Sequence, residues 1–473
     1  MSLQFIFGNS GSGKSHYLYQ QIVEESIRHP EKNYLVLVPE QFTMQTQKDL
    51  CMTHPRGGIM NIDVLSFGRL AHRVFEETGK ERQPILDDEG KNLVLRKIAG
   101  NYEDELTVLK GNLKKQGYIS EVKSVISEFT QYGIDFEQLD SFMEGLNPES
   151  YLYYKLKDIR KVYEGFEDYL RDKYITKEEL LDVLSQNVPE AKMLKDSVIA
   201  MDGFTGFTPV QNRLIGELLK VCDKIMLTVE IDRREDPFVY KHPYQLFALS
   251  KQMVTSLTEV AQEVRVEIDE PVWLCKNPSY RFKENPEMAF LEEELFRYSR
   301  RKYSGEKMRS ISLHEVHTPQ EEAQYVAEEI RRLVREEGYR YREIAVIASD
   351  LSTYADALEK ACDRYEIPVF MDHKKSILLN SFVEYLRSLL VMVEQNYTFD
   401  SVFRYLRTSL CGFTRDEVDR LENYCLALDL KGFKKWDQVW VRKTPMTTKE
   451  ELEELNHLRM HFVEKLTPLH TVL

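Results

Sequence analysis

The feature that most constrains this chain lies within residues 1–15. An apolar segment at 3–7 runs directly into Gly8-Asn9-Ser10-Gly11-Ser12-Gly13-Lys14-Ser15, a complete G-x-x-x-x-G-K-[ST] pattern, and an amphipathic helical pattern follows. Strand, glycine-rich loop and helix in this order are the context that a phosphate-binding loop requires. The sequence therefore predicts a nucleotide site, against the simpler alternative of a chance glycine-rich loop.

Each part of the pattern has a chemical task at such a site. The glycines allow backbone N–H groups to turn inward around phosphates. Lys14 is expected to reach the β- and γ-phosphates, and the Ser15 hydroxyl is expected to ligate Mg²⁺. The positive end of the helix dipole adds to the attraction. ATP and Mg²⁺ are therefore the expected ligands of residues 8–15.

Composition narrows the class of protein. The 473 residues suggest roughly two to four domains. No apolar run is long enough to span a bilayer, and the first residues lack a signal-peptide pattern. The six cysteines form no C-x-x-C pair, which argues against zinc and disulfides and predicts a reducing cytoplasm. A net charge of −14 excludes a surface that coats polyanions in bulk, but it leaves room for a local nucleic-acid channel.

Strand and helix patterns alternate in the first part of the chain, then give way to helices and return. Strands are predicted at 34–38 and 61–65, helices at 44–52 and 70–77, and later strands at 197–202 and 224–231. Between them, helical patterns occur at 89–98, 118–132, 151–173 and 176–185. We expect an α/β fold in which a phosphate-loop domain (1–78 and 192–300) is interrupted by a helical insertion (79–191). A separate helical domain is the alternative.

A second alternating unit is predicted at 310–473. Its expected strands are at 311–316, 344–348 and 367–371, and it has no phosphate loop. The helical pattern at 450–473 continues to the last residue, so we expect a second α/β domain with the start of another helical insertion, in a truncated chain.

A basic and aromatic stretch precedes this unit. Its basic residues are Arg297, Arg300, Arg301, Lys302, Lys307 and Arg309, with Phe296, Tyr298 and Tyr303 between them. Such interleaving suits single-stranded nucleic acid. The neighbouring Glu292-Glu293-Glu294 favours a solvated linker instead, and we prefer that interpretation.

Asp202 strengthens the nucleotide prediction, because a strand that ends in Asp is typical of the Mg²⁺-supporting motif beside a phosphate loop. The whole chain then resembles the AddB (RexB) family of subunits of bacterial ATP-dependent helicase/deoxyribonucleases, with the layout of superfamily 1 helicases and two RecA-like domains. The resemblance rests on GNSGSGKS at 8–15, LVPEQFTMQTQ at 37–47, LSFGRLAHRVF at 65–75, AMDGFTGFTPVQ at 200–211 and HTPQEEAQYVAEEI at 317–330.

The resemblance implies partners and a biological role. It implies a heterodimer with an AddA-type helicase/nuclease subunit, binding of single-stranded DNA and duplex DNA ends, repair of double-strand breaks by recombination, and scanning for a Chi-like regulatory sequence. Family members also carry a C-terminal nuclease domain with a cysteine-ligated iron–sulfur cluster. Neither can be placed on this sequence, whose cysteines are too dispersed.

Three departures from active helicases predict a weakened motor. Gly203 follows Asp202 where an active motor carries the Glu that positions the attacking water. Residues 228–234 do not resemble the γ-phosphate-sensing motif, and an adenine-recognition segment has no room before Gly8. We therefore predict that ATP–Mg²⁺ is bound but turned over slowly or not at all.

Loops after the second and third strands contact single-stranded DNA in active relatives, by the same resemblance. Carried to this chain, these loops and the segment after Asp202 contribute Gln41, Thr43, Phe67, Arg69, His72, Phe204 and Phe207. Amides, hydroxyls and arginine suit phosphates and base edges, and aromatic rings suit stacking. Taken singly, Phe67 and Phe207 fit a core better, and His72 fits an ordinary surface position.

Two other functions stay open. One is a DNA-stimulated ATPase that uses an unrecognised carboxylate, such as Glu230 or Glu40. The other is a small-molecule kinase, against which the helical insertion and the second α/β domain argue.

Overall fold

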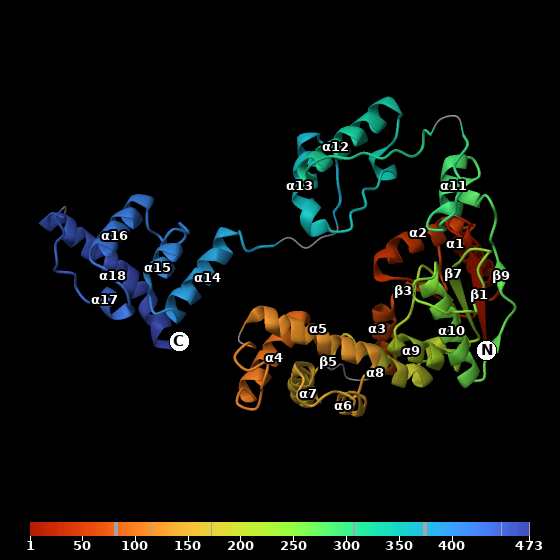
Figure 1. Ribbon diagram of the computed structural model, residues 1–473, viewed down its shortest axis with the longest axis horizontal. Helices are drawn as coiled ribbons and strands as arrows, with labels where there is room; N and C mark the ends of the chain where they lie inside the picture. Colours follow the sequence, from red (N-terminus) through yellow and green to blue (C-terminus); the bar gives the residue numbers. More distant parts are fainter. Residues whose placement is uncertain are drawn as a thin grey trace. The chain divides into compact units, whose positions relative to one another are not determined.

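The computed structural model describes residues 1–79, 84–113, 115–171, 173–305, 308–371, 376–445 and 447–472. The chain divides into two compact units, Met1–Leu313 and His314–Leu473 (Figure 1). Each unit has its own hydrophobic core. The predicted division at 1–78 with 192–300, 79–191 and 310–473 stays a prediction. Among the described residues, no helix combines the length and apolar character needed to cross a membrane.

A parallel sheet organises the first unit. Its strands are β1 (Ser2–Gly8), β2 (Tyr34–Leu37), β3 (Ile62–Leu65), β6 (Val198–Met201), β7 (Lys224–Glu230), β8 (Glu267–Ile268) and β9 (Val272–Trp273). They lie in the order β3-β2-β6-β7-β1-β8, with β9 also beside β1, and each of these pairings is parallel. The strands predicted before residue 232 are thus confirmed. Because the strands run the same way, their carboxyl ends meet at one edge, where Gly8 lies beside Glu230.

Helices cover both faces of this sheet. On one face, α1 (Lys14–Arg28) and α2 (Thr43–Thr53) pack Leu18, Ile22 and Leu50 against β2 and β6. The other face packs against α3 (Phe67–Thr78), α8 (Leu180–Asn187), α9 (Pro209–Leu219) and α10 (Ala248–Glu263). Both faces are buried, which explains why the strands read as continuous apolar runs in the sequence.

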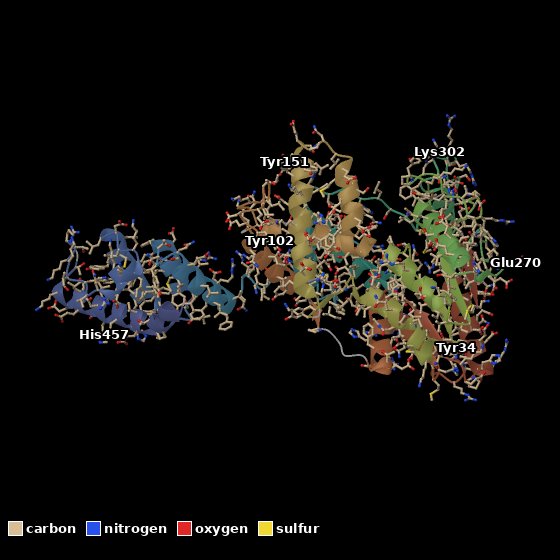
Figure 2. The ribbon with its side chains drawn as sticks, turned by 90° about the horizontal axis from the view of Figure 1, so that it is seen from below. Tyr34, Tyr102, Tyr151, Glu270, Lys302 and His457 are labelled. Atoms are coloured by element: carbon tan, nitrogen blue, oxygen red, sulfur yellow. The ribbon has the colours of Figure 1, made fainter. Side chains whose placement is uncertain are left out.

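A helical region lies between β3 and β6 in the sequence. It contains α4 (Asp88–Asn101), α5 (Gln116–Tyr132), α6 (Phe136–Glu144), α7 (Tyr151–Leu170) and α8, with β4 (Ile85–Leu86) paired to β5 (Ile175–Thr176). Figure 2 labels Tyr102 and Tyr151 in this region and Tyr34 in the sheet. The helix predicted from 176 begins only at Leu180, because residues 175–176 pair as β5.

A buried carboxylate fixes one loop of the helical region. Asp158 on α7 is 3% exposed and accepts the backbone N–H groups of Thr107, Val108 and Leu109, at 3.0, 2.7 and 2.8 Å to Oδ2. The Thr107 hydroxyl donates to Oδ1 at 2.9 Å. These charge-assisted hydrogen bonds tie residues 107–109 to α7.

The second unit is helical where the structure describes it. Its helices are α12 (Pro319–Glu336), α13 (Leu351–Arg364), α14 (Ser381–Glu394), α15 (Phe399–Leu406), α16 (Arg415–Ala427), α17 (Phe433–Asp437) and α18 (Lys449–Val472). Within 308–371, 376–445 and 447–472 no β-strand is formed, so the strands predicted at 311–316, 344–348 and 367–371 are wrong. Leu313, Ile347 and Phe370 are 98%, 95% and 89% exposed, which shows that these segments have the apolar residues of strands without a sheet to bury them.

Candidate nucleotide-binding site

The loop between β1 and α1 adopts a conformation that its glycines make possible. Gly11 and Gly13 have φ angles of +71° and +93°, in the left-handed region that other residues disfavour. Gly13 is the N-cap of α1, and no side chain in the described part of the chain caps this helix end. The N–H groups of its first turn are therefore left for another acceptor, such as a phosphate.

Close neighbours crowd two glycines of the loop. A Cβ atom on Gly8 would lie 2.3 Å from Ser12 Oγ, which would have to turn away, and one on Gly11 would lie 2.6 Å from Arg281 Cβ. Gly11 is thus required both for packing and for its backbone conformation.

Buried polar atoms at the loop lack partners. Asn9 Oδ1, Ser12 Oγ and Ser279 Oγ have no hydrogen-bond partner among the described residues. Lys14 Nζ donates to the backbone oxygen of Asn9 at 3.0 Å, so its side chain lies over the loop. Because buried polar atoms are normally paired, the Ser12 and Ser279 hydroxyls fit an acceptor such as a phosphate oxygen, whereas Asn9 Oδ1 only accepts and fits a donor group of a ligand.

Asp202, directly after β6, accepts hydrogen bonds from three hydroxyl groups on two elements, α1 and β7. Ser15 Oγ donates to Asp202 Oδ1 at 3.1 Å, and Thr228 Oγ1 on β7 donates to the same oxygen at 2.5 Å. The Tyr19 hydroxyl on α1 donates to Oδ2 at 2.7 Å. The two residues predicted to support Mg²⁺, Ser15 and Asp202, are therefore in direct contact. Mg²⁺ needs only one or two protein oxygens when phosphates and water complete its shell, so this pair fits the ion.

Charges of both signs gather around Lys14. Burial lowers its pKa, the carboxylates of Glu230 and Asp202 oppose that shift, and the Arg281 guanidinium adds to it. Arg281 N also donates to the backbone oxygen of Gly11 at 3.0 Å. Sequence reasoning missed Arg281, because it lies far along the chain in a stretch without a recognised pattern and only the fold brings it to the loop.

A segment that follows β9 covers the same loop. It contains the 3-10 turn η4 (Tyr280–Phe282) and α11 (Pro286–Glu294). Asn9 Nδ2 donates to both carboxylate oxygens of Glu292, at 3.1 and 3.2 Å, and to the backbone oxygen of Lys276 at 3.4 Å. Burial raises the pKa of Glu292, and the Asn9 hydrogen bond opposes the rise. The side chain of Asn9 thus connects the glycine-rich loop to α11.

The backbone at Gly203 disfavours a carboxylate beside Asp202. Gly203 has φ +76°, although a Cβ atom there would meet nothing closer than Pro39 Cδ at 3.7 Å. Space permits a side chain, but the left-handed backbone makes one costly. Of the two substitutes considered for the missing carboxylate, Glu230 acts electrostatically on Lys14, whereas Glu40 is exposed in η1 (Glu40–Phe42) after β2.

The predicted DNA-contacting residues fall into exposed and buried sets. Gln41, Arg69 and His72 are exposed. Thr43 is 4% exposed in the first turn of α2, and its hydroxyl donates to Glu40 O at 3.0 Å. That hydroxyl donates within the chain and keeps its acceptor positions, and the contact of Thr43 with DNA stays a prediction.

Three phenylalanines form one aromatic cluster at the carboxyl edge. Phe67 begins α3 and is buried, with its ring centre 5.5 Å from that of Phe204 and 6.2 Å from that of Phe207. Phe204 and Phe207 are half-buried and 5.1 Å apart. Phe67 therefore contacts both of the more exposed rings, and its predicted contact with DNA stays a prediction.

Two arginines of the basic and aromatic stretch, Arg297 and Arg301, form ion pairs within the chain. Arg297 Nη2 and Nη1 lie 2.6 and 2.9 Å from the carboxylates of Asp232 and Glu235. Arg301 is paired with Glu293 and Glu294. These contacts favour the linker interpretation over nucleic-acid binding; Lys307 lies outside the described residues.

Residues 5–292 match the family model described as "ADDB, N-terminal", and residues 281–465 match that of the UvrD-like helicase C-terminal domain. The chain belongs to the AddB family. The resemblance read from the motifs is thereby confirmed. The second match supports a helicase-like fold, and the two matches overlap at η4 and α11, the segment that covers the glycine-rich loop.

Curated relatives in the AddB family align along the whole chain. An ATP-dependent helicase/deoxyribonuclease subunit from Lachnoclostridium phytofermentans is 40% identical over 476 residues, which is 100% of this chain and 41% of the relative. The proteins of the same name from Clostridium perfringens and Acetivibrio thermocellus are 33% and 31% identical, over 99% and 98% of this chain and 41% of each relative. The chain therefore spans about two fifths of the length of these relatives.

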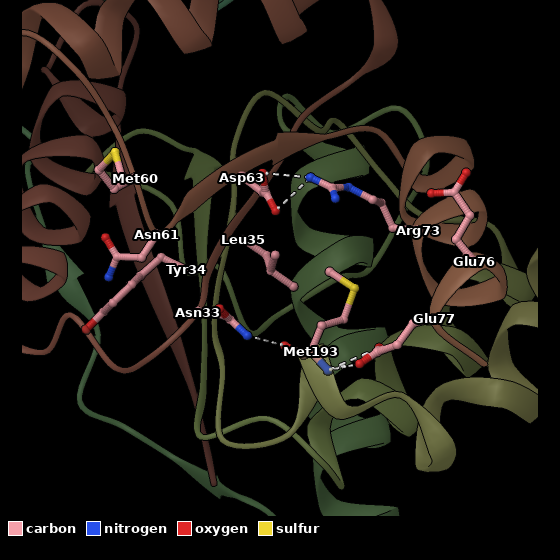
Figure 3. A pocket seen from close by; sticks show the side chains of 10 residues that line it. All are labelled: Asn33, Tyr34, Leu35, Met60, Asn61, Asp63, Arg73, Glu76, Glu77 and Met193. Carbon is pink, nitrogen blue, oxygen red and sulfur yellow. Dashed lines mark hydrogen bonds and ion pairs between the residues drawn. The ribbon is translucent and has the colours of Figure 1, made fainter. Parts of the chain in front are cut away.

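A hollow in this AddB-family chain lies at the edge of the sheet opposite to the glycine-rich loop. It has a volume of about 410 Å³ and is lined by residues near the amino ends of β2 and β3, by α3 and by Met193. Figure 3 shows Arg73 paired with Asp63, at 3.1 Å, and Glu77 accepting the backbone N–H of Met193, also at 3.1 Å. These polar groups are satisfied by one another, so the hollow offers less to a ligand than the glycine-rich loop does. Among the described residues there is no group of three or more potential metal-binding side chains at either edge.

Proposed function

We propose that this chain binds ATP–Mg²⁺ through residues 8–15 and Asp202 and hydrolyses it little or not at all. The contact of Ser15 with Asp202, beside a loop with unpaired buried polar atoms, is the observation that carries the proposal. Gly203 supports the inactive state, because it stands where an active motor carries the water-positioning carboxylate and its left-handed backbone disfavours a side chain.

We propose further that a single DNA strand lies along the same edge of the sheet. The exposed Gln41, Arg69 and His72 would contact phosphates and base edges, and Phe204 and Phe207 would stack on bases. Thr43 and Phe67, which are 4% and 8% exposed, would form the floor of this surface.

The names of the relatives extend this proposal to a complex. We place the chain as the helicase-like part of a subunit that pairs with an AddA-type helicase/nuclease, acts on duplex DNA ends in recombinational repair in the cytoplasm, and scans for a Chi-like sequence. The nuclease domain and its iron–sulfur cluster are assigned to none of the described residues.

Nucleotide binding and phosphate release, each with and without single-stranded DNA, test the motor-inactive proposal. The chain is expected to bind a fluorescent ATP analogue, and Lys14→Ala is expected to weaken binding at least about tenfold, a loss of about 1.4 kcal/mol. Lys32→Ala is the control, because Lys32 pairs with Asp223 away from the glycine-rich loop. Phosphate release that rises with DNA and disappears in Lys14→Ala would show that the motor is active.

The DNA surface is tested on a single helix. Arg69→Ala is expected to weaken binding of a single-stranded oligonucleotide several-fold and to reduce the salt dependence. Arg73→Ala on the same helix is the control, because Arg73 is paired with Asp63 at the other end of the strand. Equal losses in both variants would remove Arg69 from the proposed surface.

A DNA-stimulated ATPase is the second candidate, and Glu230 is the observation in its favour. This carboxylate lies at the carboxyl end of β7 beside Gly8 and acts on Lys14. If it serves as the base, Glu230→Gln abolishes phosphate release and retains nucleotide binding, while Glu40→Gln leaves both unchanged.

A further inference from the structure

A buried hydroxyl on α1 lies between the nucleotide site and the helix that follows the second strand. The Tyr19 hydroxyl is 2.7 Å from Asp202 Oδ2 and 3.3 Å from Thr46 Oγ1 of α2. Tyr19, Thr46 and Asp202 are 7%, 4% and 7% exposed. The glycine-rich loop pattern ends at Ser15 and assigns no task to Tyr19.

The direction of this hydrogen-bond chain follows from its chemistry. A tyrosine hydroxyl has an ordinary pKa of about 10 and therefore keeps its proton at neutral pH. That single proton is donated to the Asp202 carboxylate, which only accepts. Thr46 must therefore donate to Tyr19, which gives a chain that runs from Thr46 through Tyr19 to Asp202.

Packing alone does not require this hydroxyl. The Tyr19 ring lies in the core between α1 and the sheet, among Leu18, Ile22 and Val36. A phenylalanine ring would bury the same surface without the cost of removing a hydroxyl from water. The role of the hydroxyl therefore lies in its hydrogen bonds to Asp202 and Thr46.

The two ends of this hydrogen-bond chain lie beside the two proposed binding sites, and only Asp202 is itself part of one. Asp202 contacts Ser15 at the nucleotide site, and Thr46 lies on α2, directly after the η1 turn that carries Gln41. The segments that follow β6 and β2 also approach each other: a Cβ atom on Gly203 would lie 3.7 Å from Pro39 and 3.9 Å from Phe42.

We propose that Tyr19 is a positioning residue that couples nucleotide–Mg²⁺ binding to the binding of a DNA strand, through its hydrogen bonds to Asp202 and Thr46. The inference rests on the proposed function and adds its regulation. A Mg²⁺ ion and phosphates beside Asp202 compete with Tyr19 for the carboxylate charge. The length of the hydrogen bond between Tyr19 and Thr46 then changes, and the position of α2 and of the preceding η1 turn, which carries Gln41, changes with it. Such coupling is reciprocal, so DNA must tighten or weaken nucleotide binding by the same factor.

Two near-isosteric variants and one control test this coupling in the chain. Tyr19→Phe removes the hydroxyl from the centre of the hydrogen-bond chain, and Thr46→Val removes its far end. Tyr17→Phe is the control, because Tyr17 packs on the same core from the same helix. The dissociation constant of a fluorescent, non-hydrolysable ATP analogue is measured with Mg²⁺ and with EDTA, each with and without a single-stranded oligonucleotide.

The expected results separate positioning from simple structure. In the unchanged chain, DNA should alter the nucleotide dissociation constant in Mg²⁺ by about fivefold or more, within the usual range of coupling. Tyr19→Phe should weaken nucleotide binding about 3- to 10-fold in Mg²⁺ but not in EDTA, because it removes a hydrogen bond to the Asp202 carboxylate. In this variant DNA should no longer alter the nucleotide dissociation constant. Thr46→Val should leave each ligand's own affinity unchanged and still remove the DNA effect.

Opposite results are equally clear. A DNA effect that persists in both Tyr19→Phe and Thr46→Val, or that vanishes also in Tyr17→Phe, overturns the coupling role of the hydroxyl chain. So does an unchanged chain that binds both ligands independently. Failure of the unchanged chain to bind nucleotide at all would instead refute the proposed function. Should Tyr19→Phe not fold by circular dichroism, Thr46→Val alone decides the outcome.

Discussion

Replacing Glu167 by Gln is expected to stabilise the helical region at 88–187 when the pH is raised. Glu167 lies on α7, where burial raises its pKa to about 7 from an ordinary 4.5 and the Glu179 carboxylate adds to the rise. The folded state therefore binds a proton that the unfolded state releases. The free energy of unfolding falls as the pH rises from about 4.5 to about 7, and a neutral Gln escapes that loss.

The size of the effect follows from the shift. A rise from 4.5 to about 7 corresponds to at most about 3 kcal/mol once the carboxyl is ionised in both states, since one unit is worth about 1.4 kcal/mol. Arg171 lowers the pKa and partial solvent contact reduces the gain. Glu167→Gln should thus add about 1–3 kcal/mol to the free energy of unfolding at pH 8, and less than about 1 kcal/mol at pH 5.

Amide hydrogen exchange in α7 at pH 5 and pH 8 measures this local stability after correction for the intrinsic exchange rate. Glu164→Gln is the matched control on the same helix: Glu164 is exposed and pairs with Arg160 at 3.0 Å, and surface pairs contribute only up to about 1 kcal/mol. The reasoning is refuted if Glu167→Gln brings the same gain at both pH values, or no gain at pH 8.

Three further outcomes are expected. As the pH rises, affinity for the ATP analogue should begin to fall before the pH reaches 10.5, the ordinary pKa of lysine, because burial lowers the pKa of Lys14 and a neutral amine does not attract phosphate. Calorimetric titration at several pH values measures this fall, and Lys14→Arg should abolish it because arginine stays charged. Asp158→Ala should lower the free energy of unfolding by about 3–5 kcal/mol in urea titrations, since it leaves three backbone N–H groups without their acceptor, and a loss under about 1 kcal/mol would contradict that role. Gly203→Ala should cost about 1–2 kcal/mol in thermal unfolding because of its positive φ, whereas Gly206→Ala should stay within about 0.5 kcal/mol; equal effects would mean that backbone strain is not the cause.

The glycine-rich loop and its sheet could be predicted because their signals are local. A continuous apolar run, a glycine pattern and a helical period each lie within a few residues, and parallel strands bring their carboxyl ends to one edge without further information. The contact of Ser15 with Asp202 follows from that rule, since both residues stand at this edge.

The first residues of helices were harder to predict from the sequence, although an N-cap residue marks the start of α3. α3 begins at Phe67 because Ser66 caps it, with its hydroxyl accepting from Arg69 N at 3.4 Å. Reading Ser66 as an N-cap would have moved Phe67 and Arg69 from a loop into the first helical turn. Phe67 then faces the core, and Arg69 stays exposed.

Contacts between distant segments carry no such signal. Nothing in the sequence near Arg281 or Glu292 indicates the glycine-rich loop, and Tyr19 reads as one more apolar position of α1. What brings these side chains to the site is the packing of η4 and α11 over the loop, and of α2 against α1. A hydroxyl-bearing residue at a buried helical position is a partial exception. Because a buried hydroxyl needs a hydrogen-bond partner, its position in the sequence predicts that a partner exists, although not which residue it is.

The predicted strands at 311–316, 344–348 and 367–371, which do not form, show where a periodic pattern stops being sufficient. Alternation states which side chains share a face, but a strand exists only when its backbone N–H and C=O groups pair with another strand. Residues 311–316, 344–348 and 367–371 keep the pattern, yet Leu313, Ile347 and Phe370 remain exposed. The strands of the first unit have the same kind of pattern and are buried, because β6 and β7 return to pair with β2 and β1. Pairing between segments far apart in the chain, which no local pattern contains, therefore decided the outcome in both units.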